Sequence, residues 1–219
     1  MKRMSACLAA CILAFGTSAA SAATSVSVVS GNRGVTVLGG GPVAQTFVAT
    51  DSLLTSFGFQ FGSSSAVQVA NVTFSLLSGS GLGGTTLATS TTALTGLRPR
   101  NSTSYTFYDV FNGSVALTAG QTYTALLTTS SSNLSLIFGP DSTETTDLDA
   151  YLGGALIQRN TNDISCRTGV CDANFRFTAT AAPVAAVPET STWILMLAGF
   201  GAVGTALRYR RRATTVRFA

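Results

Sequence analysis

The sequence predicts an all-β domain, a β-sandwich or jelly roll, with a targeting segment at each end. Apolar residues alternate with small or polar ones in short runs, as at Phe57, Phe59 and Phe61, whose rings would share one face of a strand. Glycine, proline and asparagine interrupt these runs roughly every 8–12 residues. The chain is rich in Thr, Ser, Gly, Val and Phe and has a single lysine, a composition that suits strands better than helices.

The N-terminus has the three parts of a secretory signal peptide. Met1–Arg3 is basic, Ala6–Phe15 is apolar, and a stretch of small residues ends at Ala22. We therefore expect residues 1–22 to be removed by cleavage between Ala22 and Ala23, and the mature chain to be exported.

The four cysteines fall into two pairs. Leu8–Cys11 resembles a lipobox, in which Cys11 would be lipidated, but the apolar run before it is very short and continues beyond it. A signal peptide with Cys7 and Cys11 as ordinary apolar members is favoured. Only Cys166 and Cys171 remain after processing, and an oxidising compartment favours a local disulfide between them. The alternative is a redox or metal pair, but two sulfurs in a chain without histidine do not complete a zinc site.

Residues 23–180 are expected to form one domain of about nine or ten strands. The alternation slips near Ala70–Asn71, which predicts a bulge or corner, and Asn112–Gly113 predicts a turn. The runs behind this expectation are 25–29, 43–49, 57–61, 67–77, 85–97 (one or two strands), 105–110, 115–117, 123–127, 134–138, 150–157 and 173–180.

The basic character of the chain belongs to its terminal segments. The whole sequence is formally +4, but between the two ends six arginines oppose eight acidic residues, which gives −2. The charge therefore gives no support for nucleic-acid binding. Because there is no histidine, Ser–His and Cys–His catalytic pairs are excluded. We expect no catalytic residue and no resident cofactor.

The acidic residues leave two chemical alternatives open. Two carboxylates across a cleft would suffice for a glycoside hydrolase, and closely spaced carboxylates suit calcium. Four of the seven candidate acids lie within residues 141–149, where a solvated loop is favoured over a calcium site and a calcium site over catalysis. The calcium candidates are Asp141, Glu144, Asp147 and Asp149, and the catalytic candidates add Asp109, Asp163 and Asp172.

A linker, residues 181–186, leads to a C-terminal segment with three parts. These are a motif of Val187, Pro188, Glu189 and Thr190, an apolar run at 192–207, and a cluster of Arg208, Arg210, Arg211 and Arg212. The run of 16 residues would be about 24 Å long as a helix, which is short against the ~20 residues of a usual span. We expect one weak transmembrane helix, with Trp193 at one interface and the arginines on the cytoplasmic side.

This tail resembles a PEP-CTERM sorting signal, found on exported and surface proteins of Gram-negative bacteria. Thr190 stands where the family most often has a second proline, and the other features are present in order. The resemblance implies that an exosortase cleaves near Pro188–Glu189, that the helix is a transient anchor in the inner membrane, and that residues 213–219 are a cytoplasmic tail. An ordinary membrane anchor is the alternative. Separately, Thr106–Leu127 loosely resembles a strand pair of bacterial surface jelly rolls, which bears on fold alone.

Three functions remain open for the domain. The first is a non-catalytic structural or adhesion-type protein of the surface or matrix, with exopolysaccharide as a possible partner. The second is a carbohydrate-binding module, for which the aromatic candidates are Tyr105, Tyr108, Tyr123 and Tyr151. The third and least favoured is a carboxylate-dependent glycoside hydrolase. The hydroxyl-rich runs Thr89–Thr95 and Thr128–Ser132 could carry O-linked sugars, although strand propensity explains them more simply.

Overall fold

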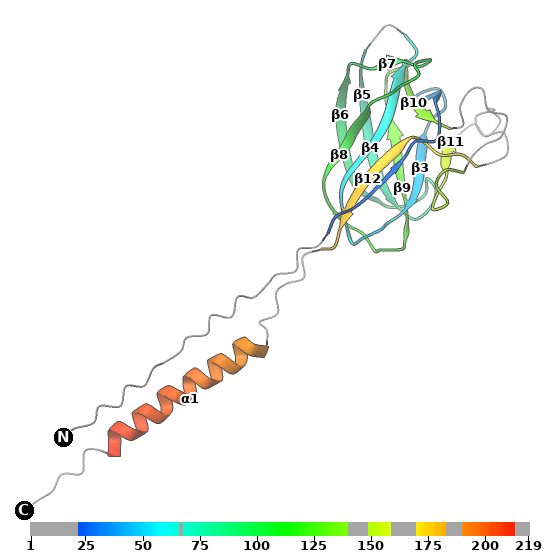
Figure 1. The fold of residues 1–219 in the computed structure, drawn as a ribbon. Coiled ribbons are helices and arrows are strands. Elements are labelled where there is room, and N and C mark those ends of the chain that lie inside the picture. Colours follow the sequence, from blue (N-terminus) through cyan, green and yellow to red (C-terminus); the bar gives the residue numbers. More distant parts are fainter. Residues whose placement is uncertain (1–21, 66–67, 140–148, 159–169, 183–189, 213–219) are drawn as a thin grey trace, which may run out of the picture. The chain divides into compact units, whose positions relative to one another are not determined.

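Figure 1 shows the computed structural model of the chain, which describes residues 22–65, 68–139, 149–158, 170–182 and 190–212. Residues 21–182 form one compact unit, and the C-terminal helix belongs to another. The two units are described separately below. The side chains of residues 190–192 and 209–212 are outside the description.

The domain is all-β, as predicted, and consists of two sheets. Every strand pairing is antiparallel except that of β4 with β7. The first sheet contains β1 (Thr24–Val28), β2 (Arg33–Thr36), β4 (Leu53–Ser63), β7 (Arg98–Pro99), β8 (Phe107–Ala116), β10 (Leu134–Phe138) and β12 (Phe175–Thr180). The second sheet has the order β11 (Leu156–Gln158), β3 (Val43–Val48), β9 (Thr122–Thr128), β5 (Val69–Ser78) and β6 (Thr86–Thr95).

Phenylalanine rings from both sheets form the core between them. Phe47 of the second sheet lies 5.0 Å from Phe57 and 4.9 Å from Phe177, both of the first sheet, measured between ring centroids. Phe57 also packs against Phe74 of β5 at 5.6 Å. The remaining fully buried rings are Phe59, Phe61 and Phe175. One continuous apolar core therefore joins the two sheets into a sandwich.

Strand β4 is the centre of the first sheet, because it has neighbours along both edges. On one edge it pairs with β12 and then β10, and on the other with β8 and then β7. Figure 1 shows β8, β4 and β12 side by side. The rings of β4 point into the core, so Gly58 and Gln60 lie on the outer face.

Two details of the predicted pattern were wrong. Asn112–Gly113 is no turn: β8 runs through it, and its pairing with β4 is irregular there. β5 shows no slip at Ala70–Asn71, because Ala70 is buried and Asn71 exposed in regular alternation; the irregularity comes later, between Leu76 and Leu77. The sequence also predicted neither β2 nor β7. Residues 85–97 contain a single strand, β6.

The second described unit is the helix α1 (Thr190–Arg212). Among the residues that the structure describes, no helix reaches the length and hydropathy that crossing a membrane would require. The predicted transmembrane helix at 192–207 is therefore not supported.

Candidate functional site

The first concentration of polar side chains is buried and surrounds Asp172, just before β12. Nε2 of Gln45, on β3, donates to Oδ1 of Asp172 at 2.8 Å, and the backbone N–H of Ala173 donates to Oε1 of Gln45 at 2.8 Å. The backbone N–H of Tyr151 donates to the other carboxylate oxygen at 2.9 Å. Both oxygens of this buried carboxylate therefore have protein donors, and the group ties the two sheets together.

Burial raises the pKa of Asp172 to about 6, because removal from water disfavours the charged carboxylate. The hydrogen bonds from Gln45 and Tyr151 lower this pKa, whereas the negative charge of Asp149 raises it. Asp172 thus titrates in a pH range where an exposed aspartate would already be ionised.

Asn174 extends the buried network to the outer strands. Its side-chain oxygen accepts hydrogen bonds from the backbone N–H and the hydroxyl of Ser30, at 2.8 and 2.9 Å. Its side-chain nitrogen donates to Oε1 of Gln60 and to the carbonyl of Gly31, both at 2.7 Å. These bonds hold the chain between β1 and β2 against β4. The polar groups of this network are hydrogen-bonded to one another, so the network stabilises the fold.

The second concentration is an open groove of about 400 Å³ on the outer face of the first sheet. Alternation along β1 and β12 turns Val26 and Phe177 inward, so their neighbours point outward. Four hydroxyls and one ion pair line the groove: Ser25, Ser27, Ser56, Thr178, Asp109 and Arg176. The hydroxyls of Ser25 and Thr178 are hydrogen-bonded at 3.1 Å.

The ion pair of Asp109 and Arg176 crosses the central strand above Gly58. Nε and Nη2 of Arg176 donate to the same carboxylate oxygen, Oδ1, at 3.1 and 2.8 Å. Both residues lie opposite Gly58 in the strand register, and a Cβ on Gly58 would come within 2.7 Å of that oxygen. The guanidinium also lies over the ring of Phe107, with its carbon 5.2 Å from the ring centroid. Glycine and Phe107 together fix the position of the pair.

This groove offers hydrogen-bonding groups without net charge. Oδ2 of Asp109 and Nη1 of Arg176 make no hydrogen bond to another described residue, and the two side chains are 35% and 44% exposed. A carboxylate oxygen accepts from hydroxyls and a guanidinium donates to them. A neutral, hydroxyl-rich ligand therefore fits. Asp109 is the one acid in the described lining, whereas the predicted glycoside hydrolase needs two carboxylates across a cleft.

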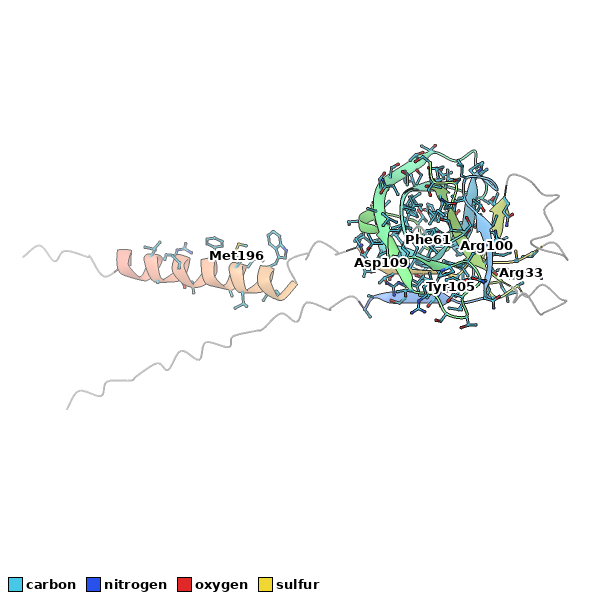
Figure 2. All side chains as sticks on the ribbon, turned by 90° about the horizontal axis from the view of Figure 1, so that it is seen from above. Arg33, Phe61, Arg100, Tyr105, Asp109 and Met196 are labelled. Carbon is cyan, nitrogen blue, oxygen red and sulfur yellow. The ribbon has the colours of Figure 1, made fainter. Side chains whose placement is uncertain are left out.

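A separate hollow of about 590 Å³ lies at the β7 end of the first sheet. Ser63–Ser65 and Pro99–Asn101 line it. The stem of Arg100 passes over Gly34, where an added Cβ would lie 2.4 Å from its Cγ. Figure 2 shows Arg33, Arg100 and Tyr105 apart from Asp109. Arg33 and Arg100 therefore lie outside the groove.

The four tyrosines predicted as a sugar platform all hold the fold together. The hydroxyls of Tyr105 and Tyr108 donate to backbone carbonyls, and those of Tyr123 and Tyr151 accept from backbone N–H groups. The ring of Tyr123 is buried, and those of Tyr108 and Tyr151 pack against the core. Burial also raises the pKa of Tyr105. None of the four lines the groove, and the ring beneath Arg176 is that of Phe107.

The other predicted acidic residues are mostly outside the described part of the chain. This holds for Asp141, Glu144, Asp147 and Asp163, whereas Asp149 is described and exposed. The described residues contain no group of three or more His, Cys, Asp or Glu side chains that could hold a metal ion. The calcium loop therefore stays a prediction.

The residues of the predicted disulfide and of the predicted processing sites are likewise only partly described. Cys171 is completely buried and disulfide-bonded, but Cys166 is outside the described residues, so their pairing stays a prediction. Ala22 and Ala23 are exposed just before β1. Val187, Pro188 and Glu189 are not described; Thr190 begins α1, Arg208 is exposed, and Arg210, Arg211 and Arg212 end the helix.

Sequence reasoning named Asp109 among seven acids but did not find the groove. Arg176 lies 67 positions away along the chain, and strand neighbours cannot be read from alternation. The available signal was Gly58 between Phe57 and Phe59, because a glycine inside a strand often marks a close approach by another group.

Comparisons with protein-family models, with curated proteins and with solved structures found no match to this chain.

Proposed function

We propose that the chain is an exported, non-catalytic protein of the cell surface or extracellular matrix, with a jelly-roll-like domain delivered by terminal sorting signals. An exosortase would cleave near Pro188–Glu189 and remove the helix and the arginine cluster. The expected signal-peptide cleavage before Ala23 would leave β1 complete. Likewise, cleavage near the motif would leave β12 complete, because that strand ends at Thr180.

The observation that carries this proposal is the exposed apolar surface of α1. Eight large apolar side chains of this helix are 47–69% exposed: Trp193, Ile194, Leu195, Met196, Leu197, Phe200, Val203 and Leu207. Such a surface requires an apolar environment. A membrane-bound processing enzyme provides one, and the arginines that follow suit the anionic inner face of a membrane.

The test is the mass of the C-terminus after production in a Gram-negative host that has an exosortase. The recovered protein should lack Arg208–Arg212. Glu189→Ala should retain them, whereas Ser191→Ala, between the motif and the apolar run, should be trimmed like the original chain. Recovery of the original protein with its arginine cluster intact would refute the sorting proposal.

A second candidate function, carbohydrate binding, is favoured by the groove over Gly58. Its hydroxyls and its balanced ion pair suit the hydroxyl groups of a neutral glycan. An anionic polysaccharide would instead require an excess of arginine. This function is compatible with a surface location.

An array of neutral and uronic-acid oligosaccharides, probed with the full chain, tests the second candidate. We expect binding to neutral members. Asp109→Asn and Arg176→Gln should each weaken it about tenfold or more, since each loses charged hydrogen bonds. Arg98→Gln is the control, because Arg98 lies on β7 and bonds Ser104 instead. Absence of binding to every neutral oligosaccharide would eliminate this candidate.

A further inference from the structure

The second sheet carries no charged residue on any of its five strands. Its strands β11, β3, β9, β5 and β6 contain only apolar, hydroxyl and amide side chains. The first sheet, by contrast, includes Arg33, Arg98, Asp109 and Arg176. Charge therefore does not protect this sheet from association with another copy of itself.

Strand β6 ends the sheet and pairs along one edge only. It pairs with β5 from Thr86 to Thr95, and among the described residues no strand pairs with its other edge. Protein edge strands are usually protected by lysine, proline, inward-pointing charge or a bulge. β6 has no charge and no proline, and the irregularity in its pairing lies at one end, where Leu76 and Leu77 meet it. Most of the length of this edge therefore lacks such protection.

Hydroxyl contacts hold β6 in place from both faces. On the outer face the hydroxyls of Thr73 and Thr91 are 3.0 Å apart, and those of Ser75 and Thr89 are 3.5 Å apart. On the inner face the hydroxyl of Thr92 donates to a backbone carbonyl of β8 at 3.3 Å. The strand is thus ordered before any partner binds, which reduces the entropy cost of pairing.

We propose that β6 pairs antiparallel with β6 of a second copy, about a two-fold axis through Thr91, so that one sheet continues across two molecules. A two-fold axis perpendicular to the sheet keeps the same face outward in both copies. Thr91 then lies opposite Thr91, Thr89 opposite Ala93, and Leu87 opposite Thr95. A charged residue near the axis would face the same residue of the other copy, but all of these pairs are neutral.

This assembly suits the proposed structural role at the surface, and its test is independent of tail processing. Thr91→Cys in the full chain, oxidised in mild detergent, should form a disulfide-linked dimer across the axis. Thr73→Cys is the matched control, because Thr73 is the outer-face neighbour of Thr91 on the interior strand β5. It should not cross-link. Failure of Thr91→Cys to cross-link more than this control would overturn the proposed register.

Sedimentation of the full chain over a range of concentrations tests the edge itself. Thr91→Lys should weaken self-association about tenfold or more, since two lysines would meet on the axis, and Thr73→Lys should change it less than about twofold. Their melting temperatures show whether both variants fold. A chain that remains monomeric throughout, or equal effects of the two lysines, would overturn the proposal. Association through α1 would be the same in both variants.

Discussion

The two sheets share one core, but their outer faces carry different kinds of side chain. The first sheet places an ion pair above a glycine, flanked by four hydroxyls, and forms one distinct groove. The second sheet repeats hydroxyl pairs between β5 and β6 and carries no charge. The charged face therefore presents a localised site, whereas the uncharged face and its free edge present a repetitive surface. We expect a ligand on the first and a second copy of the chain on the second.

Because the two sheets share one core, they should unfold together, and Phe47→Ala tests this with the largest expected effect. Phe47 belongs to the second sheet but packs on Phe57 and Phe177 of the first. Its truncation should destabilise the domain by about 3–5 kcal/mol, from lost burial and the cavity left behind. Urea denaturation should show one transition by every spectroscopic probe. Two separate transitions would mean that the sheets are independent units.

The pH dependence of stability tests the carboxylate that links the sheets. The pKa of Asp172 is about 6 in the folded protein against 3.8 in the unfolded chain. The folded state therefore binds more protons between these values, and the free energy of unfolding should fall by about 2 kcal/mol as the pH rises from 4 to 7.

Asp172→Asn should abolish most of that fall, because no group titrates at this position. Urea denaturation at pH 4 and pH 7 measures it, with Asp51→Asn, at a residue outside this network, as the control. Stability that rises equally in both proteins over this range would contradict the assignment.

A smaller effect distinguishes the groove from the core. The Asp109–Arg176 pair is partly exposed, so Asp109→Asn should cost less than about 1 kcal/mol of stability and lose its effect in high salt. The same change should strongly weaken any glycan binding. Thermal melts at low and high salt, beside the binding assay, separate the two. A loss of several kcal/mol would mean that the pair serves the fold.

The smallest effect is expected from the hydroxyl pairs on the outer face of the second sheet, between β5 and β6. Thr73→Val removes one of the two hydroxyls that meet at 3.0 Å, but valine favours strands and keeps the shape of threonine. Stability should change by less than about 0.5 kcal/mol. Thr91→Val should behave alike in the monomer. A larger loss of stability in either variant would show that the hydrogen bond between these two hydroxyls stabilises the sheet.

Local patterns in the sequence predicted most of the fold and little of the groove. Regular alternation identified β4, β9, β10 and β12, because side-chain direction in a strand repeats every two residues. The turn predicted at Asn112–Gly113 was wrong, because an Asn-Gly pair occurs both in turns and in irregular strands. Here the pairing of β8 with β4 keeps these residues in a strand. The groove could not be predicted, because Asp109 and Arg176 meet only where two distant strands flank Gly58.

The sequence by itself determined that the chain is strand-rich, that the rings of Phe57, Phe59 and Phe61 share one face, and that the net positive charge comes from the two ends. These properties depend on neighbours a few positions apart. The tertiary structure alone decided which strands are adjacent, so it alone placed the ion pair over Gly58, buried Asp172 against Gln45, and left β6 as an uncharged edge. The physical reason is that strand order is set by packing and hydrogen bonding between distant segments, which periodicity does not encode.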